Sequence, residues 1–140
     1  MDENLTIWNP GDKINQIKPY KIYEEAFKDV PQLLLQKTPE YCHHSRHLYI
    51  LRIVPERLTI SRDQFIEELK ARNVGVSVHF IALHTMSAYV KRFGYQPEDF
   101  KKAYDFSESE ISLPLYSTLG TEKAEYVAEA VLDICKKFAK

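Results

Sequence analysis

The sequence predicts an α+β fold of two layers, in which helices cover a small, three-stranded and mainly antiparallel sheet. Three observations predict it. The chain has 140 residues, of which 44% are hydrophobic and 28% charged, as is usual for one globular domain. Segments with helical spacing of apolar residues alternate with short runs rich in strand formers. The connections between those runs are long enough for helices to pack back onto the sheet.

The first helix is expected to begin at Tyr20. Residues 1–19 show no periodicity and contain the turn signal Asn9-Pro10-Gly11-Asp12, so we expect an irregular lead-in to a domain over residues 20–140. Pro31 predicts that the helix ends near Val30, because proline disrupts a helix interior. The apolar residues at helical spacing are Tyr20, Tyr23, Phe27, Val30 and Leu34.

A strand and a second helix follow. Residues 47–54 are rich in strand formers and apolar on both faces apart from Arg52, which predicts a strand covered on both sides. Ser61 and Gln64 have the spacing of a capping box, which predicts the start of a helix. Asn73 suits a left-handed stop at the end of that helix. The expected buried residues of the helix are Phe65, Ile66 and Leu69.

Two further strands and a final helix complete the prediction. Alternating valines predict a strand over residues 74–81, with His79 on the face opposite the valines. Residues 82–109 are expected to form helices and loops, with a helix start at Pro97. Residues 111–115 alternate as a short strand, which Pro114 confines to an edge or an end. Thr121 opens the last helix, whose apolar stripe is Val127, Val131, Ile134 and Phe138.

Composition excludes several classes of function. The 19 basic and 20 acidic side chains give a net charge of -1, which argues against a nucleic-acid partner. The four glycines are isolated, so no glycine-rich phosphate loop is present, and the length argues against a complete cofactor-dependent enzyme. An acidic start and the lack of a long apolar run predict a cytoplasmic protein without a membrane partner. The two cysteines, Cys42 and Cys135, are too few for a disulfide framework, and the sequence does not show whether they pair.

Two histidine clusters are candidates for chemistry. Residues 42–47 contain a cysteine and three histidines, which are side chains that bind zinc. Because all four lie within six residues at the start of a strand, a polar loop is the simpler interpretation, and no metal site is predicted. His79 and His84 lie at and after the end of a predicted strand, where ligand contacts are common. On spacing alone, a histidine satisfied by its own neighbours is the simpler interpretation of each.

Four segments stand out in order along the chain, at residues 46–49, 62–74, 78–84 and 112–115. Together they resemble the C-terminal small domain of the DegT/DnrJ/StrS family of PLP-dependent sugar aminotransferases. Arg46-His47-Leu48-Tyr49 resembles the H-x-Y start of the family's first small-domain strand, and residues 62–74 resemble its helix. Residues 78–84 resemble the V-H-Y-x-P-L-H segment, and Ser112-Leu113-Pro114-Leu115 resembles the S-L-P-L strand. Phe80 and Ala82 stand where the family has tyrosine and proline.

The resemblance implies an enzyme that transfers an amino group, typically from glutamate, to a keto sugar carried on a nucleotide. It implies a dimer with active sites at the interface, in which pyridoxal phosphate supplies the electron sink. The Schiff-base lysine and the phosphate loop belong to the family's large N-terminal domain. We therefore expect the small domain alone, inactive by itself, with no catalytic residue, no cofactor and no metal of its own. The resemblance places substrate contacts at His79, Phe80 and His84.

Two other functions remain open from the sequence. The chain could be a stand-alone interaction or regulatory module that kept the fold and lost the chemistry, because the segment from His79 to His84 departs from the family pattern. A small hydrolase or metal protein that uses the histidines is supported only by the two histidine clusters. The ordered set of four segments favours the aminotransferase domain.

Overall fold

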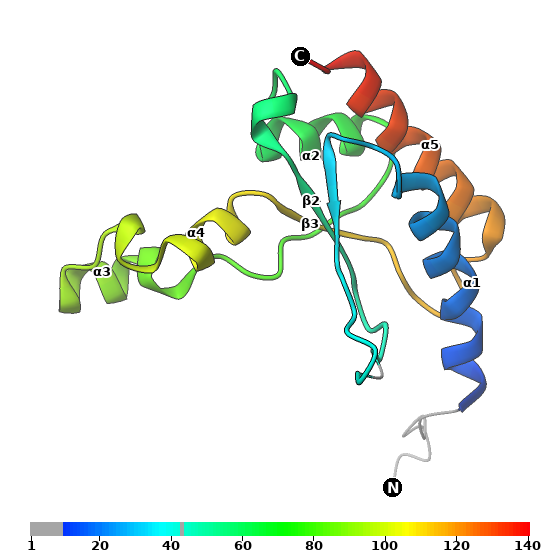
Figure 1. Cartoon of the computed structure of the whole chain (residues 1–140), viewed down its shortest axis with the longest axis horizontal. Helices are drawn as coiled ribbons and strands as arrows, with labels where there is room; N and C mark the ends of the chain where they lie inside the picture. The colour runs from blue at the N-terminus through cyan, green and yellow to red at the C-terminus, as the bar shows by residue number, and fades with distance from the viewer. Residues whose placement is uncertain (1–9, 43) are drawn as a thin grey trace, which may run out of the picture.

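The computed structural model describes residues 10–42 and 44–140, with side chains from residue 17 onward (Figure 1). Its sheet has three strands, β1 (Leu33–Leu35), β2 (Tyr49–Ile53) and β3 (Glu110–Leu113). The α-helices are α1 (Pro10–Phe27), α2 (Arg62–Ala71), α3 (Ser87–Phe93), α4 (Lys101–Ser107) and α5 (Thr121–Lys137). Three short 3-10 helices are η1 (Pro55–Arg57), η2 (Leu83–Thr85) and η3 (Pro97–Phe100).

The sheet is antiparallel throughout, in the order β1-β2-β3, and its register gives it two different faces. Leu51 lies opposite Ile111, and Arg52 lies opposite Glu110. Because side chains alternate along a strand, one face carries the apolar partners and the other carries Arg52, Glu110 and Ser112. This arrangement confirms the predicted α+β fold with a small antiparallel sheet.

The apolar face of the sheet forms the core with the long helices. Helices α1 and α5 pack against each other, and α2 contacts α5 (Figure 1). Tyr23 of α1 stacks with Phe27, meets the Tyr49 ring edge-on at 4.8 Å, and donates a hydrogen bond to the Pro114 carbonyl at 3.0 Å. Burial confirms the predicted stripe of the first helix at Tyr20, Tyr23 and Phe27 and that of the last helix at Val127, Val131 and Ile134.

The start of α2 follows the sequence prediction. The Ser61 hydroxyl accepts from the Gln64 backbone N–H at 3.3 Å, and the Gln64 side chain accepts from the Ser61 N–H at 2.9 Å. Both bonds satisfy N–H groups that have no partner within the helix. Asn73, after the helix, has φ 57°, as expected for a left-handed stop.

Residues 80–107, here called the arm, extend away from the sheet (Figure 1). The arm contains η2, α3, η3 and α4, and these elements contact mainly one another. Its helix start at Pro97 agrees with the sequence prediction. The arm exposes large apolar side chains at Phe80, Ile81, Leu83, Met86, Tyr89, Val90, Phe93 and Phe100.

One predicted strand is wrong. Residues 74–81 pair with the sheet only through the bridge between Ser77 and Ser112, beside β3. Their valines still face the core, where Val74 is buried. The third strand is instead β1, at residues 33–35, where the sequence Leu-Leu-Leu has no alternation to reveal a strand. Leu34, expected on the first helix, therefore lies in a strand.

The expected lead-in is also wrong where the structure describes it, because α1 begins at Pro10 rather than Tyr20. Residues 1–9 lie outside the described part of the chain. Proline at the first position of a helix costs no hydrogen bond, so the Asn-Pro-Gly-Asp segment is compatible with a helix start as well as with a turn. Pro19 lies inside the helix and is buried, and packing of the next two turns on the core outweighs its missing N–H.

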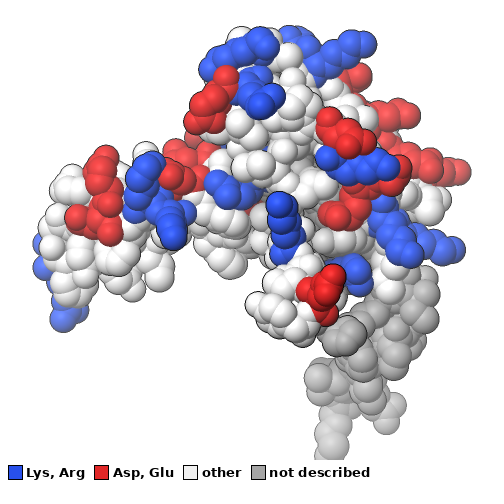
Figure 2. Space-filling view, in the orientation of Figure 1, with Lys and Arg blue, Asp and Glu red and all other residues white. Residues whose placement is uncertain are grey.

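Charge is distributed evenly over the face that Figure 2 shows. Lysine and arginine side chains lie among aspartate and glutamate side chains on both the arm and the body. Within the described residues, no helix combines the length and the hydropathy that crossing a membrane requires.

We expect Ser61→Ala to lower the free energy of unfolding by about 1 kcal/mol, because the Gln64 N–H loses its acceptor. Urea unfolding followed by circular dichroism measures the change. Ser61→Asp keeps an acceptor oxygen and is the matched control, with a value close to that of the wild type. Equal stability of the alanine variant and the wild type would contradict the role of this cap.

Stability should fall as the pH rises above about 10. Burial raises the pKa of Tyr23, and burial together with the Glu24 carboxylate raises the pKa of Tyr49, both above the ordinary value of 10.0. The unfolded chain therefore releases these phenolic protons first, so their contribution to stability is full below pH 10 and is lost above it. Melting temperatures from pH 8 to 11 measure the slope. Tyr23→Phe should reduce it, whereas Tyr41→Phe, at an exposed position, should not.

Candidate functional site

A buried carboxylate lies where the arm leaves the sheet and where it returns. The Glu110 side chain accepts the His79 backbone N–H at 2.8 Å on Oε2 and the Ser112 hydroxyl at 2.5 Å on Oε1. Nδ1 of His79 lies 2.9 Å from the same hydroxyl oxygen. These three residues form the Glu110 network, which fixes the His79 backbone and ring to β3.

Strand alternation explains why the network forms. Glu110 and Ser112 are two residues apart on β3 and therefore point to the same face of the sheet. The segment around Ser77 runs beside β3 at the edge of the sheet. Ser77 and Ser112 exchange two backbone hydrogen bonds there, at 3.2 and 2.8 Å. Glu110 is 0% exposed as a result. Buried carboxylates are costly unless hydrogen-bonded, so the two donors are part of what makes this position tolerable.

Arg62, the first residue of α2, binds the segment through which the chain returns from the arm to the sheet. Its Nη1 donates to the carbonyl of Ser107 at 2.9 Å and to the carbonyl of Glu110 at 3.2 Å, and its side chain is 11% exposed. The Ser107 carbonyl lies in the last turn of α4, where carbonyls lack partners within the helix. A guanidinium placed there satisfies the carbonyl and interacts favourably with the helix dipole.

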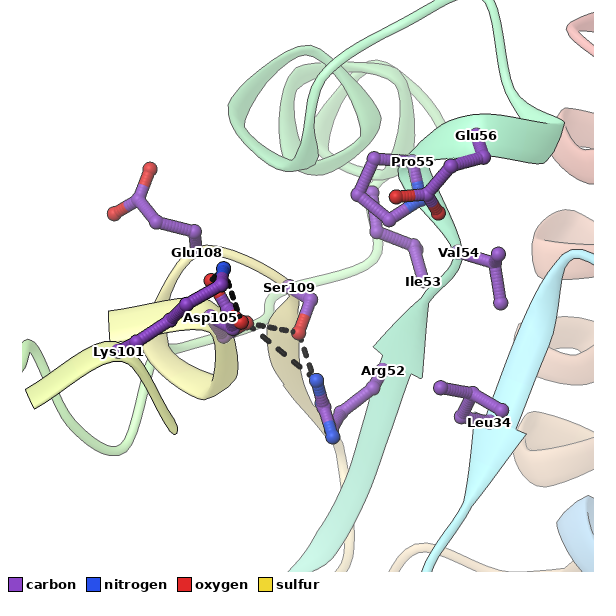
Figure 3. Close-up of a pocket in the computed structure, with 10 residues that line it drawn as sticks. All are labelled: Leu34, Arg52, Ile53, Val54, Pro55, Glu56, Lys101, Asp105, Glu108 and Ser109. Carbon is purple, nitrogen blue, oxygen red and sulfur yellow. Dashed lines mark hydrogen bonds and ion pairs between the residues drawn. The ribbon is translucent and has the colours of Figure 1, made fainter. Parts of the chain in front are cut away.

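Arg52 holds the same junction from the sheet (Figure 3). Its Nε donates to the Ser109 hydroxyl at 2.8 Å, and its guanidinium lies 5.1 Å from the centre of the Phe106 ring. The surrounding pocket has a volume of about 280 Å³ and is shared between β2 and α4. Lys101 and Asp105 of α4 form an ion pair of 2.8 Å on its wall. The two arginines thus fix α4 against the sheet.

Two of the three predicted substrate-contact residues lie together. The His79 and Phe80 rings meet edge to face, with 4.9 Å between their centres. His79 is partly buried, whereas the Phe80 side chain is 73% exposed at the base of the arm. An imidazole fixed on one edge beside an exposed aromatic ring can contact a polar ligand and pack against its apolar face.

The third, His84, lies in a different environment. It is buried in the arm, where Nε2 faces the Pro97 carbonyl oxygen at 3.2 Å and the ring lies 5.1 Å from that of Phe100. This bond joins η2 to η3. His84 also lines an apolar hollow of about 420 Å³ with Leu83, Tyr89, Tyr95, Phe100 and Ala103.

The first histidine cluster offers no metal site within the described residues. Cys42 is exposed, His43 lies outside the described part, and Nδ1 of His44 accepts the Arg46 N–H at 2.8 Å. Across the rest of the described chain, no group of three histidine, cysteine, aspartate or glutamate side chains is close enough to hold a metal ion.

Sequence reasoning missed Glu110, Ser112 and the two arginines. Alternation with Ile111 and Leu113 makes Glu110 and Ser112 look like solvent-facing residues, but all four positions of β3 are buried. Arg62 carried a usable signal. A cation at the first position of a helix is unfavourable for the helix dipole, which indicates that the side chain serves another contact.

A family profile matches residues 14–132, and its description is the DegT/DnrJ/EryC1/StrS aminotransferase family. Among curated proteins, an uncharacterised protein of Methanocaldococcus jannaschii is 44% identical over 114 residues, which are 81% of this chain and 30% of that protein. The spore coat polysaccharide biosynthesis protein SpsC of Bacillus subtilis is 36% identical over 115 residues, with the same two shares, 81% and 30%.

Solved structures show the same relation. PseC of Helicobacter pylori, an aminotransferase involved in the biosynthesis of pseudoaminic acid, has a TM-score of 0.82 at 26% identity, over 92% of this chain and 34% of that one. Spr1654 of Streptococcus pneumoniae, described as a candidate sugar aminotransferase and solved in its PLP-form, has a TM-score of 0.81 at 29% identity, over 91% and 32%. This chain therefore spans about a third of the length of the proteins that it matches. The chain belongs to the DegT/DnrJ/EryC1/StrS aminotransferase family.

Proposed function

We propose that the chain is the C-terminal small domain of a PLP-dependent aminotransferase that acts on a keto sugar carried on a nucleotide. The observation that carries the proposal is the family match over residues 14–132, combined with a share of about one third of each relative. The same match favours this proposal over a stand-alone interaction module. Glutamate is the proposed amino donor, a dimer the proposed assembly, and the cytoplasm the proposed location.

The residues that the structure describes do not fit pyridoxal phosphate by themselves. Every lysine whose side chain is described is exposed, including Lys101, which pairs with Asp105. A Cβ built on Gly75, Gly94 or Gly120 would meet no atom within 4 Å, so none of these glycines makes room for a phosphate. These observations support the proposal that the lysine and the phosphate site belong to a large N-terminal domain.

Within the complete enzyme, we propose that His79 and Phe80 contact the sugar substrate. The support is their placement: a partly buried imidazole fixed to β3 lies against a largely exposed ring at the base of the arm. Phe80 lacks the hydroxyl that the family tyrosine has, so it would contribute ring contact only. His84, bound to the Pro97 carbonyl, would shape the arm beside them and contact the substrate through its remaining ring edge.

Mixing this chain with pyridoxal phosphate and then borohydride should give no stoichiometric covalent adduct, because exposed lysines react unselectively and weakly. Intact-mass spectrometry measures the adduct. A separately expressed large domain of the same enzyme is the positive control and should gain one cofactor mass. A single adduct at one lysine of this chain, at full yield, would contradict the proposed division between the two domains.

In the complete enzyme, His79→Ala should weaken binding of the nucleotide sugar about tenfold, which corresponds to one lost hydrogen bond of roughly 1.4 kcal/mol. The absorbance of the bound cofactor should stay the same. Isothermal titration measures the affinity, and the exposed His47 provides the control variant His47→Ala. Wild-type affinity in the His79 variant would refute the proposed contact.

A further inference from the structure

We propose that Glu110 and Ser112 are positioning residues that hold neutral His79 as its Nδ1–H tautomer, so that Nε2 presents a lone pair to a sugar hydroxyl. The proposal rests on the proposed function in one respect, that His79 contacts the substrate. The protonation pattern itself follows from the contacts of this chain.

The direction of the hydrogen bonds assigns the tautomer. The Ser112 hydroxyl donates its single proton to Glu110 Oε1, at 2.5 Å. The second carboxylate oxygen, Oε2, is occupied by the His79 backbone N–H at 2.8 Å, which can only donate. The Ser112 oxygen, 2.9 Å from His79 Nδ1, has then only lone pairs to offer to the ring. Nδ1 must therefore carry the proton, and in a neutral imidazole Nε2 then carries none.

The free edge of the ring is accessible. Nε2 of His79 makes no hydrogen bond with any described residue. It is not buried either, because among the described residues the only buried side-chain nitrogen or oxygen without a hydrogen bond is Nε of Arg46. The Nδ1 edge, by contrast, lies against Ser112, which is buried. The accessible part of the His79 ring therefore includes Nε2, next to the exposed Phe80 ring.

An unprotonated Nε2 selects the chemistry of the ligand. It accepts a hydrogen bond, so it matches a group that donates, such as a sugar hydroxyl, and it repels the lone pairs of a phosphate oxygen or a carboxylate. The network thus directs His79 to the sugar part of a nucleotide sugar and away from its phosphates. The exposed ring of Phe80, edge to face with His79, suits the same assignment, because an aromatic face packs on the C–H face of a sugar ring.

Two other histidines of the chain have the opposite pattern and serve as internal references. Nε2 of His84 faces a carbonyl oxygen, which only accepts, so Nε2 carries the proton. Nδ1 of His44 accepts a backbone N–H, so its proton is also on Nε2. His79 is thus expected to differ from both in one spectrum.

Long-range nitrogen–proton NMR correlations of the 140-residue chain at pH 8 test the assignment, because they distinguish a protonated from an unprotonated ring nitrogen. We expect Nδ1–H for His79 and Nε2–H for His84 and His44. An Nε2–H pattern for His79 in the wild type overturns the proposal, whatever the variants do.

Glu110→Gln is the sharpest variant because it nearly preserves shape. Its single carbonyl oxygen can accept the His79 N–H, and its amide then donates to Ser112, which turns the hydroxyl proton toward Nδ1. We expect the His79 tautomer to switch to Nε2–H while His84 and His44 stay unchanged. A His79 that keeps its Nδ1–H pattern in this variant overturns the role of Glu110. Ser112→Ala removes the acceptor of Nδ1, so His79 should no longer be held in the Nδ1–H form. This second variant tests the proposal if Glu110→Gln does not fold.

Binding separates this inference from the proposed function. In the complete enzyme, Glu110→Gln should weaken binding of the nucleotide sugar about tenfold and leave binding of the free nucleotide diphosphate unchanged, because only the sugar contact is altered. Equal weakening for both ligands overturns the assignment to a sugar hydroxyl. If the NMR pattern is as expected but His79→Ala binds normally, the proposed substrate contact fails, and the hydroxyl assignment fails with it, although the tautomer assignment stands.

Discussion

The Glu110 carboxylate is the constraint on which the geometry of the arm depends. One of its oxygens holds the backbone at His79, where the chain leaves the sheet, and the other holds Ser112, just after the chain has returned. Arg62 adds a bond to the Glu110 carbonyl and one to the end of α4. Because the side chain is buried, each lost partner would leave a buried oxygen without a hydrogen bond, which makes alternative placements of the arm unfavourable.

The sheet divides the molecule into an apolar half and a polar half. On one face, aromatic residues of α1 and apolar residues of α5 bury the strands mainly by close packing. On the other face, hydrogen bonds with defined directions replace packing. The same strand, β3, supplies Ile111 to the first and Glu110 to the second. Alternate residues of one strand thus contribute to different features: Ile111 to the packed core, and Glu110 to the placement of His79.

Local signals accounted for much of the fold. The capping box at Ser61, the stop at Asn73 and the stripes of the long helices depend on near neighbours, and the structure has them as predicted. The strand at residues 33–35 and the single bridge of Ser77 depend on long-range pairing, which leaves no period in the sequence. The placement of His79 beside Phe80 follows from adjacency, but its bond to Ser112 joins residues 33 positions apart. The Arg62 contacts with residues 107 and 110 arise from the same kind of distant pairing.

The arm is connected to the body mainly through its base, and its own helices contact one another. It therefore has the properties of a separate cooperative unit, which can open without exposing the core of the sheet. Changes in the length or sequence of residues 83–100 would alter the surface of the arm at little cost to the remainder of the fold. Such a unit can diversify on its own. The outer surface of the arm can therefore change while the scaffold stays the same.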